Sequence, residues 1–112
     1  MTSRHIFTAV LILSASAFQA SAQEFGDAQK GQAFAQMVCS ECHSVTARPA
    51  PSPNSKAPAF SAVANTSGMT ALALRTWLQT SHPTMPNIRL ESADRDNVIA
   101  YILTLNSKSK GL

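Results

Sequence analysis

The chain has 112 residues and a formal net charge of +3, with 45% hydrophobic, 6% aromatic and 13% charged residues. This length holds one domain and excludes a multi-domain enzyme with a large active-site cleft. The basic residues are scattered and do not form a cluster interleaved with aromatic residues that could stack bases, which argues against nucleic acid as a partner.

The first 22 residues have the pattern of a secretory signal peptide. Arg4 and His5 form a polar start, residues 6–18 are an apolar run, and residues 20–22 (Ala-Ser-Ala) supply small residues for cleavage. The apolar run is short for a membrane span, although an uncleaved anchor or a buried helix is an alternative. We therefore expect export, cleavage after Ala22, no stable membrane insertion afterwards, and a mature domain over residues 23–112.

Three segments of the mature chain have the periodicity of main helices, and a fourth is shorter. Asp27 is placed to cap a helix that continues to Val38, a short helix is expected over residues 59–64, and Thr70 caps a helix that continues to about Thr80. Ser92 is expected to cap the last helix. The apolar stripe of that helix consists of Val98, Ile99, Ile102, Leu103 and Leu105. No strand pattern stands out, so the sequence predicts an all-α fold.

Two segments between these helices are rich in proline and are predicted to be loops, residues 44–58 and residues 81–87. Short helices joined by such loops make a thin hydrophobic core for a domain of this size. Met37 is expected to belong to that core. We therefore expect a bound group to fill the middle of the domain.

Residues 39–43 read Cys-Ser-Glu-Cys-His, which is the C-x-x-C-H attachment sequence of c-type haem. Cys39 and Cys42 can form thioether bonds with the two vinyl groups of one porphyrin, and His43 then reaches the iron. The alternatives are a disulfide, a thioredoxin-like redox pair, which needs a βαβ context that the pattern does not show, and a zinc site, which needs four ligands. Export is required for haem attachment and therefore favours haem.

With this motif the chain resembles the small monohaem class I cytochromes c of bacterial periplasms, over essentially all of the mature part. The resemblance is carried by residues 27–31, residues 39–43, residues 56–60, residues 85–87 and residues 98–103. It implies a cytochrome c fold in which three main helices, a short helix and loops surround one covalently attached haem c. The first and last helices are expected to cross near Gly31, where the missing Cβ lets Tyr101 or Ile102 approach closely.

The resemblance also implies a methionine on the iron face opposite His43, and Met85 matches it. Chain length alone does not separate Met85 from Met69, because both lie far enough past His43 to span a haem. Met69 precedes a helix, where a buried thioether is the ordinary role, whereas Met85 lies between two prolines in an irregular segment. We therefore predict Met85 as the sixth ligand, with His82 as a competing donor that is expected to be a solvated loop histidine.

Two further residues match family positions around the haem. Pro58 corresponds to a proline whose carbonyl accepts a hydrogen bond from Nδ1 of the axial histidine, and Trp77 corresponds to a residue that packs near a haem propionate. The alternatives are an ordinary loop proline and a buried core tryptophan.

The function that the resemblance implies is one-electron transfer in the periplasm, without an enzymatic reaction. Two axial ligands leave no open position on the iron, and a methionine ligand raises the reduction potential. The expected partners are a dehydrogenase as donor and an oxidase or reductase as acceptor, with the chain as a monomer or as a subunit of a hetero-complex. The alternatives are a haem c relay subunit bound permanently to a periplasmic dehydrogenase, and an enzyme or gas sensor with a vacant sixth position.

Overall fold

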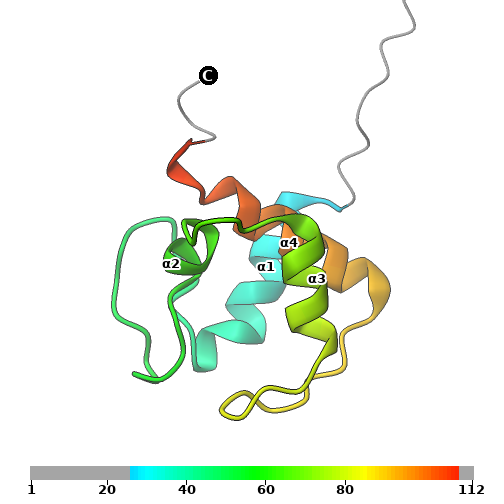
Figure 1. The fold of residues 1–112 in the computed structure, drawn as a ribbon, viewed down its shortest axis with the longest axis horizontal. Helices are drawn as coiled ribbons and strands as arrows, with labels where there is room; N and C mark the ends of the chain where they lie inside the picture. The colour runs from blue at the N-terminus through cyan, green and yellow to red at the C-terminus, as the bar shows by residue number, and fades with distance from the viewer. Residues whose placement is uncertain (1–25, 109–112) are drawn as a thin grey trace, which may run out of the picture.

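The computed structural model describes residues 26–108, so the predicted signal peptide lies outside the described residues. Within this range the structure contains helices and loops but no strand (Figure 1). His82 and Met85 form an isolated β-bridge. The prediction of an all-α fold is confirmed. The elements are α1 (Ala28–Met37), the 3-10 helix η1 (Cys39–Glu41), α2 (Phe60–Ala64), α3 (Ala71–Gln79) and α4 (Ser92–Thr104).

Two of the predicted helix caps are present. The Asp27 carboxylate accepts hydrogen bonds from the Gln29 and Lys30 amides, at 2.9 and 3.1 Å. The Thr70 hydroxyl accepts a hydrogen bond from the Ala73 amide at 3.1 Å. These bonds satisfy amide groups that have no partner inside the first turn of a helix, and they explain why α1 and α3 begin where they do.

The cap predicted for the last helix is wrong by one residue. Glu91 is the N-cap of α4 and has no side-chain capping bond, whereas Ser92 is already helical. The Arg95 amide donates to the Glu91 carbonyl at 3.0 Å. Helical hydrogen bonding therefore begins at the carbonyl before Ser92, which leaves its hydroxyl one position too late to cap the first turn.

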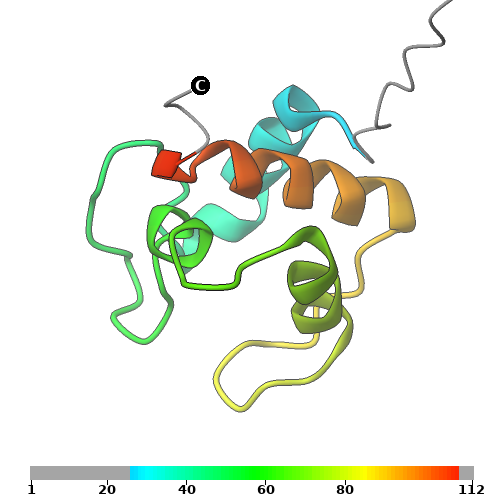
Figure 2. The same cartoon turned by 45° about the horizontal axis from the view of Figure 1, so that its top comes forward.

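Helices α1 and α4 lie against each other and form the most extensive contact between elements (Figure 2). A Cβ on Gly31 would lie 1.9 Å from the Asn97 carbonyl oxygen and 2.9 Å from the Val98 nitrogen. The predicted crossing at Gly31 is therefore present. The facing residues are the backbone of Asn97 and Val98, not Tyr101 or Ile102, which lie about one turn further along α4.

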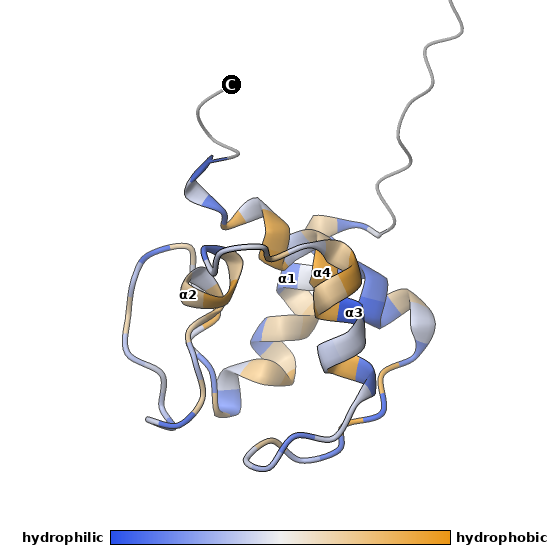
Figure 3. Ribbon diagram, viewed as in Figure 1, coloured by the Kyte–Doolittle hydropathy of each residue, from blue (hydrophilic) through white to orange (hydrophobic). Residues whose placement is uncertain are grey.

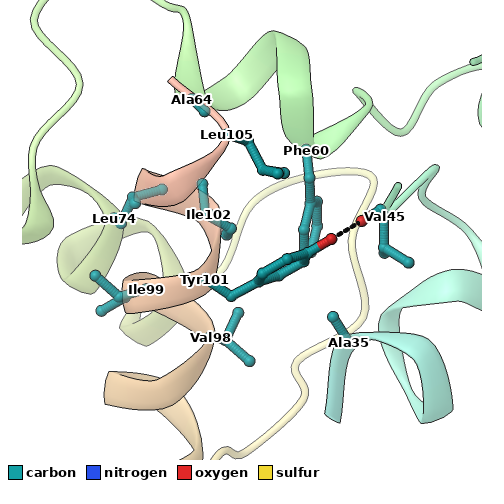
Figure 4. Close-up of a cluster of buried hydrophobic side chains, with 10 residues drawn as sticks. All are labelled: Ala35, Val45, Phe60, Ala64, Leu74, Val98, Ile99, Tyr101, Ile102 and Leu105. Carbon is teal, nitrogen blue, oxygen red and sulfur yellow. Dashed lines mark hydrogen bonds between the residues drawn. The ribbon is translucent and has the colours of Figure 1, made fainter. Parts of the chain in front are cut away.

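Helix α4 supplies four of the ten buried hydrophobic residues of the core. Figure 3 shows that it is hydrophilic in its first turns and hydrophobic in the following ones, and Figure 4 shows its buried side chains facing those of the other elements. The Tyr101 hydroxyl donates to the Val45 carbonyl and so ties α4 to the loop after the C-x-x-C-H motif. The buried hydrophobic residues are Ala35, Val45, Phe60, Ala64, Leu74, Val98, Ile99, Tyr101, Ile102 and Leu105.

Met37 does not belong to this core. Its side chain is 77% exposed, so the expectation that it lies in the core is wrong. Ala35, two positions earlier, is fully buried, and a step of two residues turns a side chain to the far side of a helix. Among the described residues, no helix is both long enough and apolar enough to cross a membrane.

Candidate functional site

A cavity of about 1200 Å³ lies between the helices and the two proline-rich loops. Every site residue predicted from the sequence lines it, although the residues come from η1 and the two positions after it, from α3 and from both loops. The predicted site residues in its wall are Cys39, Cys42, His43, Pro58, Trp77 and Met85. Core side chains complete the wall on the helical side, namely Phe60, Leu74, Val98 and Ile102.

The end of α1 places the two cysteines. The chain tightens into η1, where the amides of Cys42 and His43 both donate to the Cys39 carbonyl, at 3.2 and 2.9 Å. Both cysteines are free thiols in the cavity wall, not a disulfide. This compact turn keeps Cys39, Cys42 and His43 together in the wall of the cavity.

The Cys39 thiol has the wrong acidity for a redox-active pair. Burial raises the pKa of Cys39 to about 11, because the thiolate would lose its hydration. Thiols that exchange with disulfides have lowered pKa values, so the structure does not favour the thioredoxin-like alternative. The zinc alternative requires four ligands, and residues 26–108 contain no group of three or more His, Cys, Asp or Glu placed to hold a metal ion.

A backbone carbonyl orients His43. Its Nδ1 lies 2.7 Å from the Pro58 oxygen, and a carbonyl only accepts hydrogen bonds, so Nδ1 carries the proton. The predicted hydrogen bond is therefore present. The neutral ring then has its free electron pair on Nε2, the atom suited to bind a metal. Phe60 packs against the ring with a centroid separation of 5.4 Å and an interplanar angle of 52°.

Two thioethers line the cavity, those of Met69 and Met85. Met69 also packs against the hydrophobic core, whereas Met85 lies on a turn in which its amide donates to the His82 carbonyl at 3.3 Å. The geometry is consistent with the choice of Met85, which stays a prediction.

Trp77 is 56% exposed, so the alternative of a buried core tryptophan is wrong. Its indole meets the His82 imidazole edge-on, with centroids 5.2 Å apart and an interplanar angle of 84°. A contact between Trp77 and a haem propionate stays a prediction.

His82 is not the solvated loop histidine that was expected. It is half-buried, and its Nε2 lies 3.1 Å from the Met85 sulfur. The spacing of three residues around Pro83 was the available signal, because a tight turn brings its first and fourth residues together.

Sequence reasoning missed Arg95, which also lines the cavity. Its Nε is buried and has no hydrogen-bond partner, because the nearest Asp96 oxygen lies 3.7 Å away. Buried donors are normally paired. An anionic group held in the cavity would supply the missing acceptor.

The family model for cytochrome c matches residues 28–106, from the start of α1 to just beyond the end of α4. The chain belongs to the cytochrome c family. No curated protein and no solved structure matches it. Cytochromes c carry haem c and are generally electron carriers, so the function of this chain is haem-based electron transfer.

The cavity of this cytochrome c fits a haem by its own chemistry. Two free thiols stand beside an imidazole with an available Nε2, thioethers line the same space, and the walls are largely apolar. The Nε of Arg95, which has no hydrogen-bond partner, adds a donor suited to a carboxylate, and haem carries two carboxylates. Polar and apolar parts of the cavity wall therefore both match the group that the family implies.

Proposed function

We propose that this cytochrome c is a periplasmic one-electron carrier with one haem c, attached through Cys39 and Cys42 and ligated by His43 and Met85. The observation that carries the proposal is the convergence on one cavity of the C-x-x-C-H residues and a loop methionine. The local sequence joins the motif residues, and the fold places the distant Met85 in the wall of the same cavity.

Each residue has a distinct task in this proposal. The two cysteines hold the group by thioether bonds, and the Pro58 carbonyl fixes the orientation of His43 and strengthens Nε2 as a donor. Met85 supplies a soft, neutral sulfur that favours the ferrous state. A haem bound in this way supplies one-electron chemistry, with iron alternating between its ferric and ferrous states and a raised reduction potential.

His43 and Met85 together would leave no position on the iron for oxygen, as a carrier requires and an oxygen-activating enzyme does not. Loss of residues 1–22 would remove Arg4, one of nine basic residues, and leave the six acidic ones, for a mature charge of +2. Two haem carboxylates would offset that charge. We therefore propose weakly steered encounters with a dehydrogenase as donor and an oxidase or reductase as acceptor.

The first experiment measures covalent attachment. The full chain is expressed with export and haem attachment, and intact mass is expected to equal residues 23–112 plus one haem. Acid–acetone extraction should leave the haem on the protein. Extraction of the haem, or free alkylation of both thiols, would contradict the proposal.

The second experiment identifies the sixth ligand, with Met69→Ala as the matched control for Met85→Ala. Met85→Ala is expected to abolish the weak far-red sulfur-to-iron absorption of the ferric protein and to lower the reduction potential. Met69→Ala should keep both properties. The reverse pattern would assign the ligand to Met69 and overturn this part of the proposal.

A third measurement separates a free carrier from a permanent relay subunit. Tagged, haem-loaded protein purified from its own periplasm is expected to elute as a monomer. Stoichiometric co-elution with a dehydrogenase through size-exclusion chromatography would favour the relay subunit instead.

A further inference from the structure

We propose that His82 is a reserve axial ligand, whose Nε2 binds the iron when the Met85 thioether is lost. The proposal rests on the proposed function, because it takes Met85 as the resting ligand. The observation behind it is that His82 Nε2 and Met85 Sδ lie 3.1 Å apart in the wall of the same cavity.

The hydrogen bonding of His82 shows which of its nitrogens is free to bind a metal. Its Nδ1 lies 3.0 Å from the Thr80 carbonyl oxygen. Because that oxygen only accepts, Nδ1 carries the proton of the neutral ring, and the electron pair is left on Nε2. The thioether sulfur facing Nε2 also offers electron pairs. The contact is a hydrogen bond only when Nε2 carries a proton. In the neutral ring with the proton on Nδ1 it joins two electron-pair donors, and one metal ion is able to take either of them.

The backbone between the two residues holds both donors on one side of the chain. His82 and Met85 form an isolated antiparallel bridge, closed by the bond from the Met85 amide to the His82 carbonyl. Directly opposed residues of such a bridge present their side chains on the same side. Pro83 stiffens the turn because its φ is fixed.

Trp77 keeps the imidazole at this position by its edge-on contact. Residues 80–91 lie outside the helices, so moving Nε2 by the 3.1 Å that separates it from the sulfur breaks no helical hydrogen bond. An exchange of ligands therefore requires only a local movement of the turn.

The consequence is protection of the carrier against unwanted reactivity. The thioether would be lost, for example, when hydrogen peroxide transfers one oxygen atom to the Met85 sulfur, forming the sulfoxide and water. That loss would otherwise leave a coordination position open to further peroxide. His82 would then hold that position with its Nε2, and the nitrogen ligand would give the haem a lower potential. The damaged protein then stops serving its acceptor without becoming a peroxidase.

The test uses the full, haem-loaded chain with three variants, Met85→Ala, His82→Ala and the double variant. In the ferric state Met85→Ala is expected to be low-spin with two nitrogen ligands by electron paramagnetic resonance, and the double variant is expected to be high-spin. If His82 holds the position nine-tenths of the time in Met85→Ala, azide should bind the double variant about tenfold more tightly. Peroxidase turnover should rise in the double variant alone.

Three outcomes would overturn the proposal. They are a high-spin Met85→Ala protein, a double variant that stays low-spin, and azide affinities that do not differ between the two. Added imidazole should return the double variant to the low-spin state, which shows that its haem site is intact.

The single variant His82→Ala is expected to keep the far-red band. Loss of the band in this variant would show that His82 supports Met85 in the resting state, and it would overturn the proposal that His82 is a reserve ligand. A wild-type protein without the band would instead contradict the assignment of Met85, and thus the proposed function itself.

Discussion

Replacement of Gly31 by alanine tests the packing of α1 against α4, because two effects of known sign oppose each other. In an isolated helix alanine is favoured over glycine by about 1 kcal/mol. In this structure the new Cβ would lie 1.9 Å from the Asn97 carbonyl oxygen and 2.4 Å from its carbon. Both atoms belong to the backbone of α4 and have no rotamer to change.

The structure sets the size of the steric effect. A carbon and a carbonyl oxygen approach to about 3.3 Å at closest, so the helices would have to separate by about 1.4 Å at this point. Overpacking of this kind costs about 1 to 3 kcal/mol, with the upper end expected where the backbone must move. After the helix preference is subtracted, Gly31→Ala should destabilise the protein by about 2 kcal/mol. This corresponds to a fall in Tm of roughly 8 to 16 °C for a domain of this length.

The measurement is thermal and guanidinium unfolding of the haem-loaded protein, followed by circular dichroism and by haem absorbance. Gln32→Ala is the control, because Gln32 is the exposed neighbour of Gly31 on the same helix. Its replacement should change the free energy of unfolding by less than about 0.5 kcal/mol. Equal or higher stability of Gly31→Ala would refute the reasoning, because helix preference would then outweigh the contact with α4.

Three further changes have expected outcomes that can be measured. Tyr101→Phe should cost about 1 to 2 kcal/mol at neutral pH, because the Val45 carbonyl loses its donor. Burial raises the pKa of Tyr101 above 10.0, so its contribution is present below pH 10.0 and lost as pH rises through the folded pKa. Denaturant unfolding between about pH 8 and 11 should therefore show that the free energy of unfolding falls with rising pH, and that it falls less in Tyr101→Phe than in the wild type. An equal fall in both proteins would contradict this. Asp27→Ala should lower the free energy of unfolding by about 1 kcal/mol, because α1 loses its N-cap. Asp27→Asn should lower it by much less, because an asparagine side chain also caps a helix. Equal losses in the two variants would argue against capping. Replacing Cys39 and Cys42 together by serine should abolish cooperative unfolding and most of the helical circular dichroism. Without the attached haem, core side chains in the cavity wall would face water. Native helical content in that variant would show that the fold does not need the haem.

The sequence alone determined the features that depend on neighbouring residues. The caps at Asp27 and Thr70 were predictable because a capping bond spans only two or three residues. The two loops followed from their prolines, which cannot continue a helix. The C-x-x-C-H motif identified the chemistry for the same reason, since its two thiols and its imidazole lie within five consecutive residues.

Only the tertiary structure decided which distant residues meet. It placed Asn97 against Gly31, turned Met37 outward, and put Arg95 into the cavity wall with a buried Nε that has no hydrogen-bond partner. It also brought His82 against Met85. These outcomes depend on the register and rotation of packed elements, which are set by the summed packing of many side chains. A shift of one residue along a helix turns a side chain by about 100°, so local patterns do not specify such contacts.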